Sequence, residues 1–276
     1  PTYASAGQSN EGGEAPIASA PANLLGPLTD AYIYNPTAAA TQQLEIGVNN
    51  QGNSASMFGP EMETARVVGA AWGRRIMLIK HALSGAHLAN DDLADSFYPL
   101  TGTQWTTQLN RTIAAFAYER GQGRECEIYS FFWFQNEADM IGVTGGGALY
   151  VSSYQSNLNL YTDTYRDLIS LRGFGRSNLR FIAIKSAIAI VPYTTVVNGS
   201  PLNVQANNAI QAACDANENA QAMWIADIAT FIDGIHLDAP AQVKVGNRRA
   251  LIALSSFAPF IAWAAKVRNY ILTSTP

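Results

Sequence analysis

The sequence predicts an α/β fold in which a mostly parallel β-sheet carries helices on both faces. Three short apolar runs, at residues 75–80, 126–134 and 181–191, are typical of strands buried on both faces. Helical patterns separate these runs, so strands and helices alternate, as expected for parallel strands joined by right-handed crossovers. The run 126–134 leads into polar residues at 135–139, and open α/β sheets bind ligands at this end of their strands.

The predicted helices begin and end at local signals. Pro60 starts a helix that runs to about Gly73, because proline in the first turn loses no hydrogen bond. Residues 149–171 carry apolar side chains at steps near 3.6, which predicts an amphipathic helix whose tyrosines face the core. The other expected elements are helices at about 104–120 and 202–216, a short strand at 222–226, and a helical region from Pro240 that Pro259 divides.

Residues 14–57 are rich in Ala, Pro, Asn, Ser and Gly, and we expect a long irregular insertion with two short strands at 31–34 and 43–48. Long loops in compact domains often bind ligands, so this segment is expected to form a wall of the substrate site. Residues 1–276 show no second core and are predicted to form one domain. Because numbering begins at Pro1 without Met, we expect a processed chain or part of a larger one, extracellular or virion-associated.

Composition limits the classes of function. Hydrophobic residues make up 48% of the chain and charged residues 14%, which indicates a folded protein with a neutral exterior. The formal net charge is -4, so nucleic-acid binding, which needs a basic surface, is not expected. No apolar run reaches the roughly 20 residues of a membrane span. Cys126 and Cys214 are too few for a disulfide framework and are expected to be buried thiols.

Three stretches contain the residue types of a serine hydrolase. Ser9 lies in the small-residue turn Ala6-Gly7-Gln8-Ser9-Asn10, and a serine nucleophile needs a base for its proton and donors for the oxyanion. His236 follows Asp233 by three residues, a spacing that lets the carboxylate fix the imidazole tautomer within one loop. The third stretch, residues 133–139, changes abruptly from apolar side chains to amides and carboxylates. We predict Ser9 as nucleophile, His236 as base and Asp233 as the orienting acid.

These stretches resemble the sialate-O-acetylesterase-like carbohydrate esterases, a branch of the SGNH hydrolases. The resemblance covers nearly the whole chain and implies the three-layer α/β/α SGNH-hydrolase (flavodoxin-like) fold. This chain differs in having Asn136 where the family usually has glycine, and in a shorter strand before the serine. The similar segments, in the family's order, are Gly7-Gln8-Ser9-Asn10, Phe58-Gly59-Pro60-Glu61, Lys80-His81-Ala82-Leu83-Ser84-Gly85, Trp133-Phe134-Gln135-Asn136-Glu137-Ala138-Asp139 and Asp233-Gly234-Ile235-His236-Leu237.

The resemblance also implies roles for residues around the nucleophile. The oxyanion is expected to be held by the backbone N–H groups of Ser9 and Gly85 and by the Gln135 amide. Three further residues are expected to support the site, namely Asn10, Asn136 and Glu137. Asn10 ties the turn together, and Asn136 narrows the pocket or contacts sugar. Glu137 either accepts backbone N–H bonds or positions His236 or the substrate.

The leading hypothesis is a serine esterase that removes O-acetyl groups from a carbohydrate, either a polysaccharide or a sialic-acid-type glycan. The acetyl-enzyme chemistry requires no metal and no organic cofactor. One alternative is a non-catalytic carbohydrate-binding or structural domain of a secreted or viral assembly. Another is an SGNH lipase or thioesterase, although the polar insertion favours a hydrophilic substrate.

Two other sets of residues have side chains that bind ligands in other proteins. His81 and His87, with Asp91, Asp92 and Asp95 downstream, do not have the spacing of a common metal site. Among the five tryptophans, Trp105 follows a polar loop and is the one expected to contact a sugar, if any does.

Overall fold

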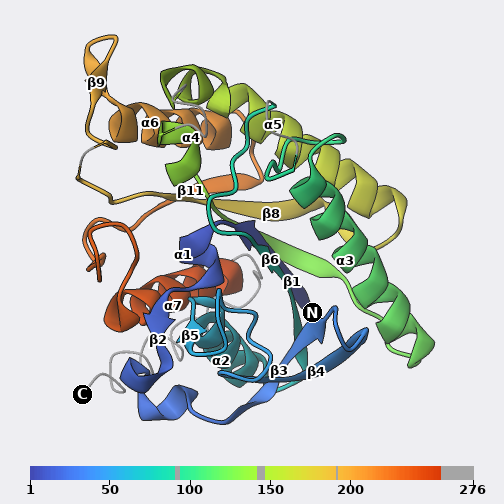
Figure 1. The fold of residues 1–276 in the computed structure, drawn as a ribbon. Coiled ribbons are helices and arrows are strands. Elements are labelled where there is room, and N and C mark those ends of the chain that lie inside the picture. The colour runs from blue at the N-terminus through green and yellow to red at the C-terminus, as the bar shows by residue number, and fades with distance from the viewer. Residues whose placement is uncertain (91–93, 142–146, 191, 256–276) are drawn as a thin grey trace.

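A seven-stranded sheet with the order β11-β8-β7-β1-β6-β3-β4 forms the centre of the protein (Figure 1). The computed structural model describes residues 1–90, 94–141, 147–190 and 192–255. Neighbouring strands are parallel, except that β3 and β4 are antiparallel. This confirms the predicted α/β fold with a mostly parallel sheet. The strands are β1 (Thr2–Gly7), β3 (Pro27–Asn35), β4 (Ala40–Glu45), β6 (Ile76–Ala82), β7 (Ile128–Phe134), β8 (Gly175–Lys185) and β11 (Ala220–Trp224).

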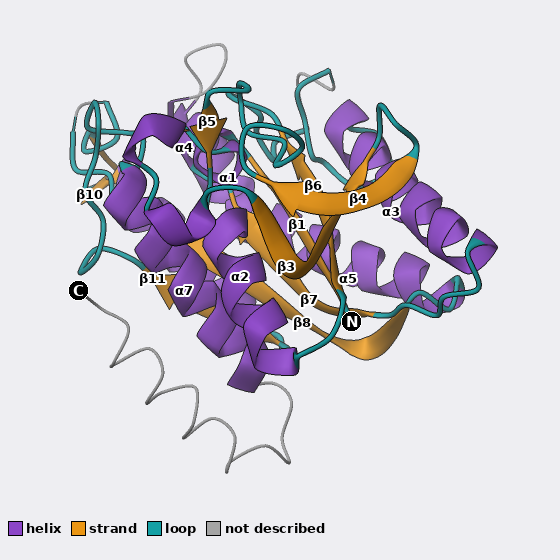
Figure 2. Ribbon diagram, turned by 90° about the horizontal axis from the view of Figure 1, so that it is seen from below, coloured by secondary structure: helices purple, strands orange, loops and turns teal. Residues whose placement is uncertain are grey.

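Helices cover both faces of the sheet and give the fold three layers (Figures 1 and 2). On one face α2 (Glu61–Trp72) packs against α7 (Ala239–Ser255). The other face carries α3 (Thr103–Gly121), α5 (Gly147–Leu171) and α6 (Leu202–Asp215). The short elements are α1 (Ser9–Gly12), α4 (Glu137–Ile141), the 3-10 helices Ile17–Ser19 and Ala22–Leu24, and the strand pairs β2 (Ala15–Pro16) with β5 (Met57–Phe58) and β9 (Val196–Val197) with β10 (Ser200–Pro201).

The central strands are apolar on both sides because each contributes alternate residues to two cores. In β1, Tyr3 packs in the core under α2 and α7, whereas Ala4 and Ala6 pack in the core under α3, α5 and α6. In β7, Phe132 packs in the core under α2 and α7, and Trp133 packs in the core under α3, α5 and α6. Although β1 has only six residues, it pairs along its length with both β6 and β7. The short first strand is therefore the central strand of the sheet.

The four helices predicted between residues 60 and 216 are confirmed to within a few residues. The strand predicted at 181–191 is wrong in its limits, because β8 spans Gly175–Lys185. Its apolar run continues past the sheet into a separate small core, where Ile188 packs with Tyr193 and Leu202. Burial continues there although strand pairing has ended, so hydrophobicity alone misplaced the boundary. The continuation expected beyond Pro259 lies outside the described residues.

The prediction of an irregular insertion at 14–57 is wrong for the middle of that segment. Residues 27–45 form the hairpin of β3 and β4, which extends the central sheet because β3 pairs in parallel with β6. The short strand expected at 31–34 is only part of β3. Asp30 has a φ of 60° and the β3–β4 register shifts between Pro27 and Tyr32. This irregularity breaks the alternating pattern by which a strand is recognised in a sequence.

The contact between α2 and α7 requires glycine at position 246. A Cβ atom there would lie 2.4 Å from the carbonyl oxygen of Pro60 and 2.8 Å from the Cβ of Glu63. The hydroxyl of Thr64 donates a hydrogen bond of 3.1 Å to the carbonyl oxygen of Gly246, which holds the two helices together at this crossing.

We expect Gly246→Ala to lower the free energy of unfolding by about 1–3 kcal/mol, because α2 and α7 must separate to admit the methyl group. Gly121→Ala, at the end of α3, is the matched control, since a Cβ there meets nothing within 4 Å. The control should change stability by less than about 1 kcal/mol. Urea unfolding followed by circular dichroism measures both, and equal stability of the two variants would contradict the close helix contact.

Candidate active site

Ser9 is the first residue of α1 and lies directly beyond the carboxyl end of the central strand β1. Gly7 allows the sharp strand-to-helix turn, because a Cβ at this position would lie 2.1 Å from the carbonyl oxygen of Phe134. The N–H of Gly13 donates to the carbonyl oxygen of Ser9 at 2.7 Å and closes the turn. Because Ser9 is the first residue of α1, its N–H has no acceptor within the helix, and it donates to no described residue.

The loop after β11 holds Asp233 and His236 in contact, as their spacing predicted. Asp233 Oδ1 accepts the N–H groups of Ile235 at 3.0 Å and His236 at 2.8 Å. Asp233 Oδ2 lies 2.7 Å from His236 Nδ1. Gly234 has a φ of 88°, the left-handed conformation that glycine adopts without strain. With Nδ1–H donating to the carboxylate, the neutral ring keeps Nε2 as a proton acceptor.

The charge on Asp233 is stabilised within this loop. Burial acts to raise the pKa of the carboxyl group, but hydrogen bonds from the backbone and ring of His236 and from the N–H of Ile235 outweigh it. Together they lower the pKa of Asp233 to about 2. Asp233 is therefore ionised at neutral pH and favours a proton on Nδ1 of the ring.

The side chain of Asn10 joins the serine turn to the histidine loop. Its Nδ2 donates to the carbonyl oxygen of Ile235 at 3.1 Å, and its Oδ1 accepts the N–H of Leu237 at 2.9 Å. These two residues flank His236. Among the described residues, no hydrogen bond joins the Ser9 hydroxyl to His236. The two segments are joined through Asn10, which follows Ser9 and bonds the residues on both sides of His236.

The loop after β6 presents Gly85 beside the same turn. The N–H of Leu83 donates to the carbonyl oxygen of Gly7 at 3.1 Å, and the N–H of Leu88 donates to the Asp139 carboxylate at 2.9 and 3.2 Å. Gly85 itself is exposed, with a φ of 78°. Its N–H donates to no described residue.

Gln135 is fully buried and uses its amide group inside the protein. Its Nε2 lies 2.6 Å from Asp139 Oδ2, 3.0 Å from the carbonyl oxygen of Ala86 and 3.2 Å from Gln8 Oε1. Two N–H hydrogens already face three acceptors, so donation to an oxyanion would require one of these bonds to be given up. Through these contacts, Gln135 connects the segments that follow β1, β6 and β7.

Asn136 differs from Gln135 in its hydrogen bonding. Its side chain is fully buried, and neither its amide nitrogen nor its oxygen has a hydrogen-bond partner among the described residues. Buried amides without partners are rare in folded proteins. Asn136 follows the carboxyl end of β7, the strand next to β1, so this unpaired amide lies at the same edge of the sheet as Ser9.

Glu137 supports Asn10. Its Oε1 accepts the amide of Asn10 at 2.9 Å, and its Oε2 accepts the N–H of Asn136 at 3.1 Å. Complete burial raises the pKa of its carboxyl group, against the effect of these hydrogen bonds. No hydrogen bond to His236 occurs in the described part of the chain. Of the two roles expected for Glu137, its contacts match the acceptance of N–H bonds.

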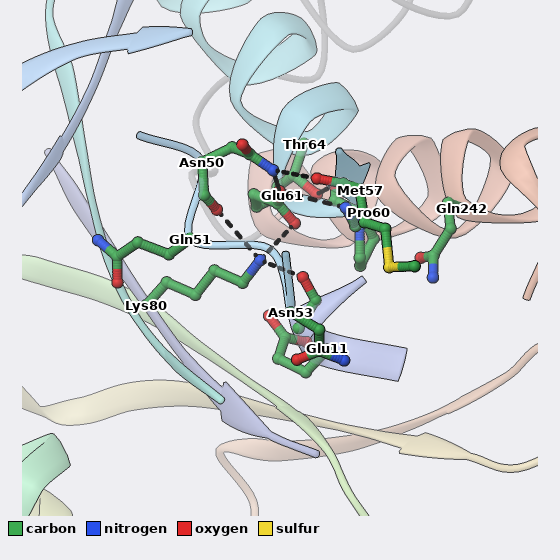
Figure 3. A network of polar contacts seen from close by, with 12 residues as sticks. Glu11, Asn50, Gln51, Asn53, Met57, Pro60, Glu61, Thr64, Lys80 and Gln242 are labelled. Atoms are coloured by element: carbon green, nitrogen blue, oxygen red, sulfur yellow. Dashed lines mark hydrogen bonds and ion pairs between the residues drawn. The ribbon is translucent and has the colours of Figure 1, made fainter. Parts of the chain in front are cut away.

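Two buried ion pairs beneath α1 were not recognised in the sequence. Glu11 pairs with Arg249 of α7, and Lys80 Nζ lies 2.9 Å from Glu61 Oε2. Lys80 Nζ also donates to the carbonyl oxygens of Gly12 at 2.9 Å and Asn50 at 3.3 Å (Figure 3). The signal available was a lysine at the end of an apolar strand and a glutamate two residues after the predicted nucleophile.

The other candidate residues are structural. Nε2 of His81 is hydrogen-bonded to Gln104 at 2.9 Å, and burial lowers the pKa of the ring to about 4. Trp105 is buried against Tyr161, so the expectation that it contacts a sugar is wrong. Cys126 and Cys214 are free thiols. Cys214 is buried as expected, whereas the expectation is wrong for Cys126, which is half-buried.

Within the described ranges, no group of three or more histidine, cysteine or acidic side chains could hold a metal ion. Asp91 and Asp92, considered with His81 and His87, lie outside these ranges. None of the described helices combines the length and the apolar character that a membrane crossing requires.

No known family model matches this chain, and no curated protein matches it in sequence. Solved structures do resemble it. A protein from Arabidopsis thaliana has a TM-score of 0.71 at 18% identity, over 93% of this chain and 98% of its own. A carbohydrate acetylesterase from Xanthomonas citri has a TM-score of 0.55 at 15% identity, over 91% of this chain and 55% of its own.

A carbohydrate acetylesterase from Sinorhizobium meliloti has a TM-score of 0.52 at 12% identity, over 93% of this chain and 100% of its own. At these identities the similarity shows the fold alone. The chain shares the three-layer α/β fold of these proteins, with its mostly parallel central sheet.

Proposed function

We propose that this protein is a serine esterase that removes O-acetyl groups from a carbohydrate. The observation that carries the proposal is the joining of two distant segments by Asn10, which places the turn of Ser9 against the loop of Asp233 and His236. The occurrence of the same fold in two carbohydrate acetylesterases supports the class of substrate.

In the proposed mechanism, Ser9 Oγ attacks the acetyl carbonyl carbon while Nε2 of His236 takes the hydroxyl proton. Asp233 accepts the Nδ1–H bond and stabilises the imidazolium. The tetrahedral intermediate collapses, and His236 returns the proton to the departing sugar oxygen. Water activated by the same imidazole then attacks the acetyl-enzyme, which releases acetate and regenerates Ser9.

The oxyanion is proposed to bind three donors. The N–H groups of Ser9 and Gly85 donate to no described residue, and both lie at the carboxyl ends of neighbouring strands. For the third donor we choose the Asn136 amide in place of Gln135, because Asn136 has no partner and Gln135 has three acceptors. A preorganised donor of this kind contributes about 3–4 kcal/mol to transition-state stabilisation.

A second candidate function is the hydrolysis of esters with longer apolar acyl chains. It is favoured by two exposed isoleucines beside the histidine loop. Ile190 and Ile232 are 38% and 52% exposed. Ile190 lies against the histidine loop, since a Cβ on Gly234 would be 3.0 Å from its Cδ1. The N–H of Ile232 donates to the carbonyl oxygen of His236 at 2.8 Å. These side chains could contact a longer acyl chain, as in the lipase alternative.

Labelling by a fluorophosphonate tests the nucleophile without knowledge of the sugar. We expect one adduct per chain on the native sequence and none on Ser9→Ala, measured by intact mass, because only a serine with an adjacent base reacts at a useful rate. Ser156→Ala, at an exposed serine of α5, serves as the control and should still be labelled. Absence of an adduct on the native protein would favour the non-catalytic binding domain. Faster hydrolysis of octanoyl than of acetyl nitrophenyl esters would favour the second candidate.

Paired variants distinguish the two amides after β7. Asn136→Ala should lower kcat by about 100- to 1000-fold with little loss of stability, because it removes an oxyanion donor that has no other partner. Gln135→Ala should lower the free energy of unfolding by about 2 kcal/mol or more, because it leaves buried acceptors unpaired. Nitrophenyl acetate kinetics and urea unfolding provide the two readouts. A loss of kcat below about tenfold in Asn136→Ala would contradict its assignment.

The lowered pKa of Asp233 gives a pH dependence of stability. Its folded-state pKa of about 2 lies below the ordinary value of 3.8, so the unfolded chain binds this proton more tightly. The stabilisation is therefore present above pH 3.8 and is lost as the pH falls through about 2. The stability difference between the native sequence and Asp233→Asn should shrink over this interval. A difference independent of pH would show that the loop does not stabilise the charge.

A further inference from the structure

We infer that Glu14, Asn53 and Ser84 form a subsite beside Ser9 for the hydroxyl groups of an uncharged sugar, and that this subsite disfavours anionic sugars. The part of this inference that concerns the ester substrate rests on the proposed function. The binding of the sugar itself can be measured without any catalysis.

The three side chains come from different segments and meet at the nucleophile turn. Asn53 Nδ2 donates to the carbonyl oxygen of Ser9 at 3.3 Å and also to Glu14 Oε1. The hydroxyl of Ser84 lies 3.5 Å from Glu14 Oε1. Glu14 follows α1, Asn53 lies in the loop between β4 and β5, and Ser84 precedes Gly85, the proposed oxyanion donor. A group bound here would lie next to the reacting ester.

Close packing of Asn53 on α1 depends on Gly12. A Cβ at this position would lie 2.1 Å from Asn53 Oδ1, so any other residue would displace the Asn53 side chain from its contact with the serine turn. Although Asn53 touches the serine turn, it remains exposed, as does Ser84, and Glu14 is half-buried. The cluster is therefore accessible to a ligand while it contacts the candidate active site.

The loop that carries Asn53 is held by buried polar groups (Figure 3). Lys80, paired with Glu61, donates to the carbonyl oxygen of Asn50, and the Asn50 amide donates to the carbonyl oxygen of Met57 at 3.0 Å. Arg111 donates to Gln51 Oε1 at 2.9 Å. Because these contacts order the loop in advance, less conformational entropy is lost when Asn53 binds a ligand.

The groups left open in the cluster are hydrogen-bond acceptors. Glu14 Oε2 and Asn53 Oδ1 have no hydrogen-bond partner among the described residues, and the Ser84 hydroxyl can also accept. Sugar hydroxyls supply matching donors. The Glu14 carboxylate would repel a sugar carboxylate, and no lysine or arginine in the described part of the chain contributes a hydrogen bond to these three residues. These contacts favour an uncharged polysaccharide over a sialic-acid-type glycan.

The kinetic test compares three acetyl esters, namely nitrophenyl acetate, acetylated methyl glucoside and acetylated methyl glucuronoside, which adds a carboxylate to the same ring. In Glu14→Gln and Asn53→Ala, the kcat/KM for the glucoside ester relative to nitrophenyl acetate should fall about 10-fold, through KM. Glu14→Gln should also reduce the discrimination against the glucuronoside ester, because it removes the repelling charge. Asn53→Ala should retain that discrimination.

Glu218→Gln is the matched control, since Glu218 is exposed in the loop that leads into β11, at the opposite edge of the sheet. It should leave these ratios as they are in the native protein. Unchanged ratios in Glu14→Gln and Asn53→Ala would overturn the inference. A native preference for the glucuronoside ester would overturn it too, while the esterase proposal would stand.

Saturation-transfer NMR with unacetylated methyl glucoside and methyl xyloside tests binding independently of catalysis. Signals should appear with the native protein and with Glu218→Gln, and should weaken with Glu14→Gln and Asn53→Ala. If Ser9 takes the fluorophosphonate but glycoside signals do not depend on Glu14, the inference fails and the esterase remains. If Ser9 does not react but binding requires Glu14, the esterase fails and the subsite remains.

Discussion

The candidate active site depends on the hydrogen bonds of one buried amide, that of Asn10. This side chain connects the first turn after β1 with α4 and with the loop after β11, three segments that are far apart in the chain. No disulfide crosslinks the described residues, so fully satisfied buried polar groups must define these positions. Loss of the Asn10 amide would leave donors and acceptors on both sides of His236 unpaired and would release the loop from Ser9.

Two buried ion pairs, Glu11–Arg249 and Lys80–Glu61, also hold the turn that contains Ser9. A buried pair contributes little net stability, because desolvation offsets its attraction, but removal of one partner leaves an unpaired charge at a cost of about 3–5 kcal/mol. Lys80 therefore permits few alternative positions for the end of α1 and for the loop at Asn50. The same cation thus positions the proposed nucleophile turn and the loop that carries the proposed sugar contact.

Elements with strong local signals could be predicted closely from the sequence. Proline precedes α2 and Gly73 ends it in the left-handed conformation, and both residues act within one turn of the chain. The contact of Asp233 with His236 is local in the same sense, since three residues separate them. By contrast, β3 has a left-handed residue in its middle and gains its place through pairing with β6, 45 residues away at Ala31 and Ile76, so its own pattern was too weak.

The sequence by itself determined the alternation of strands and helices, the serine turn, and the acid and histidine of one loop, because these depend on residues close together in the chain. Only the tertiary structure decided which amide after β7 is free. Gln135 and Asn136 are adjacent and chemically alike, yet Gln135 meets acceptors from Gln8, Ala86 and Asp139, and Asn136 meets none among the described residues. Hydrogen bonds between distant segments exist only once the chain has folded.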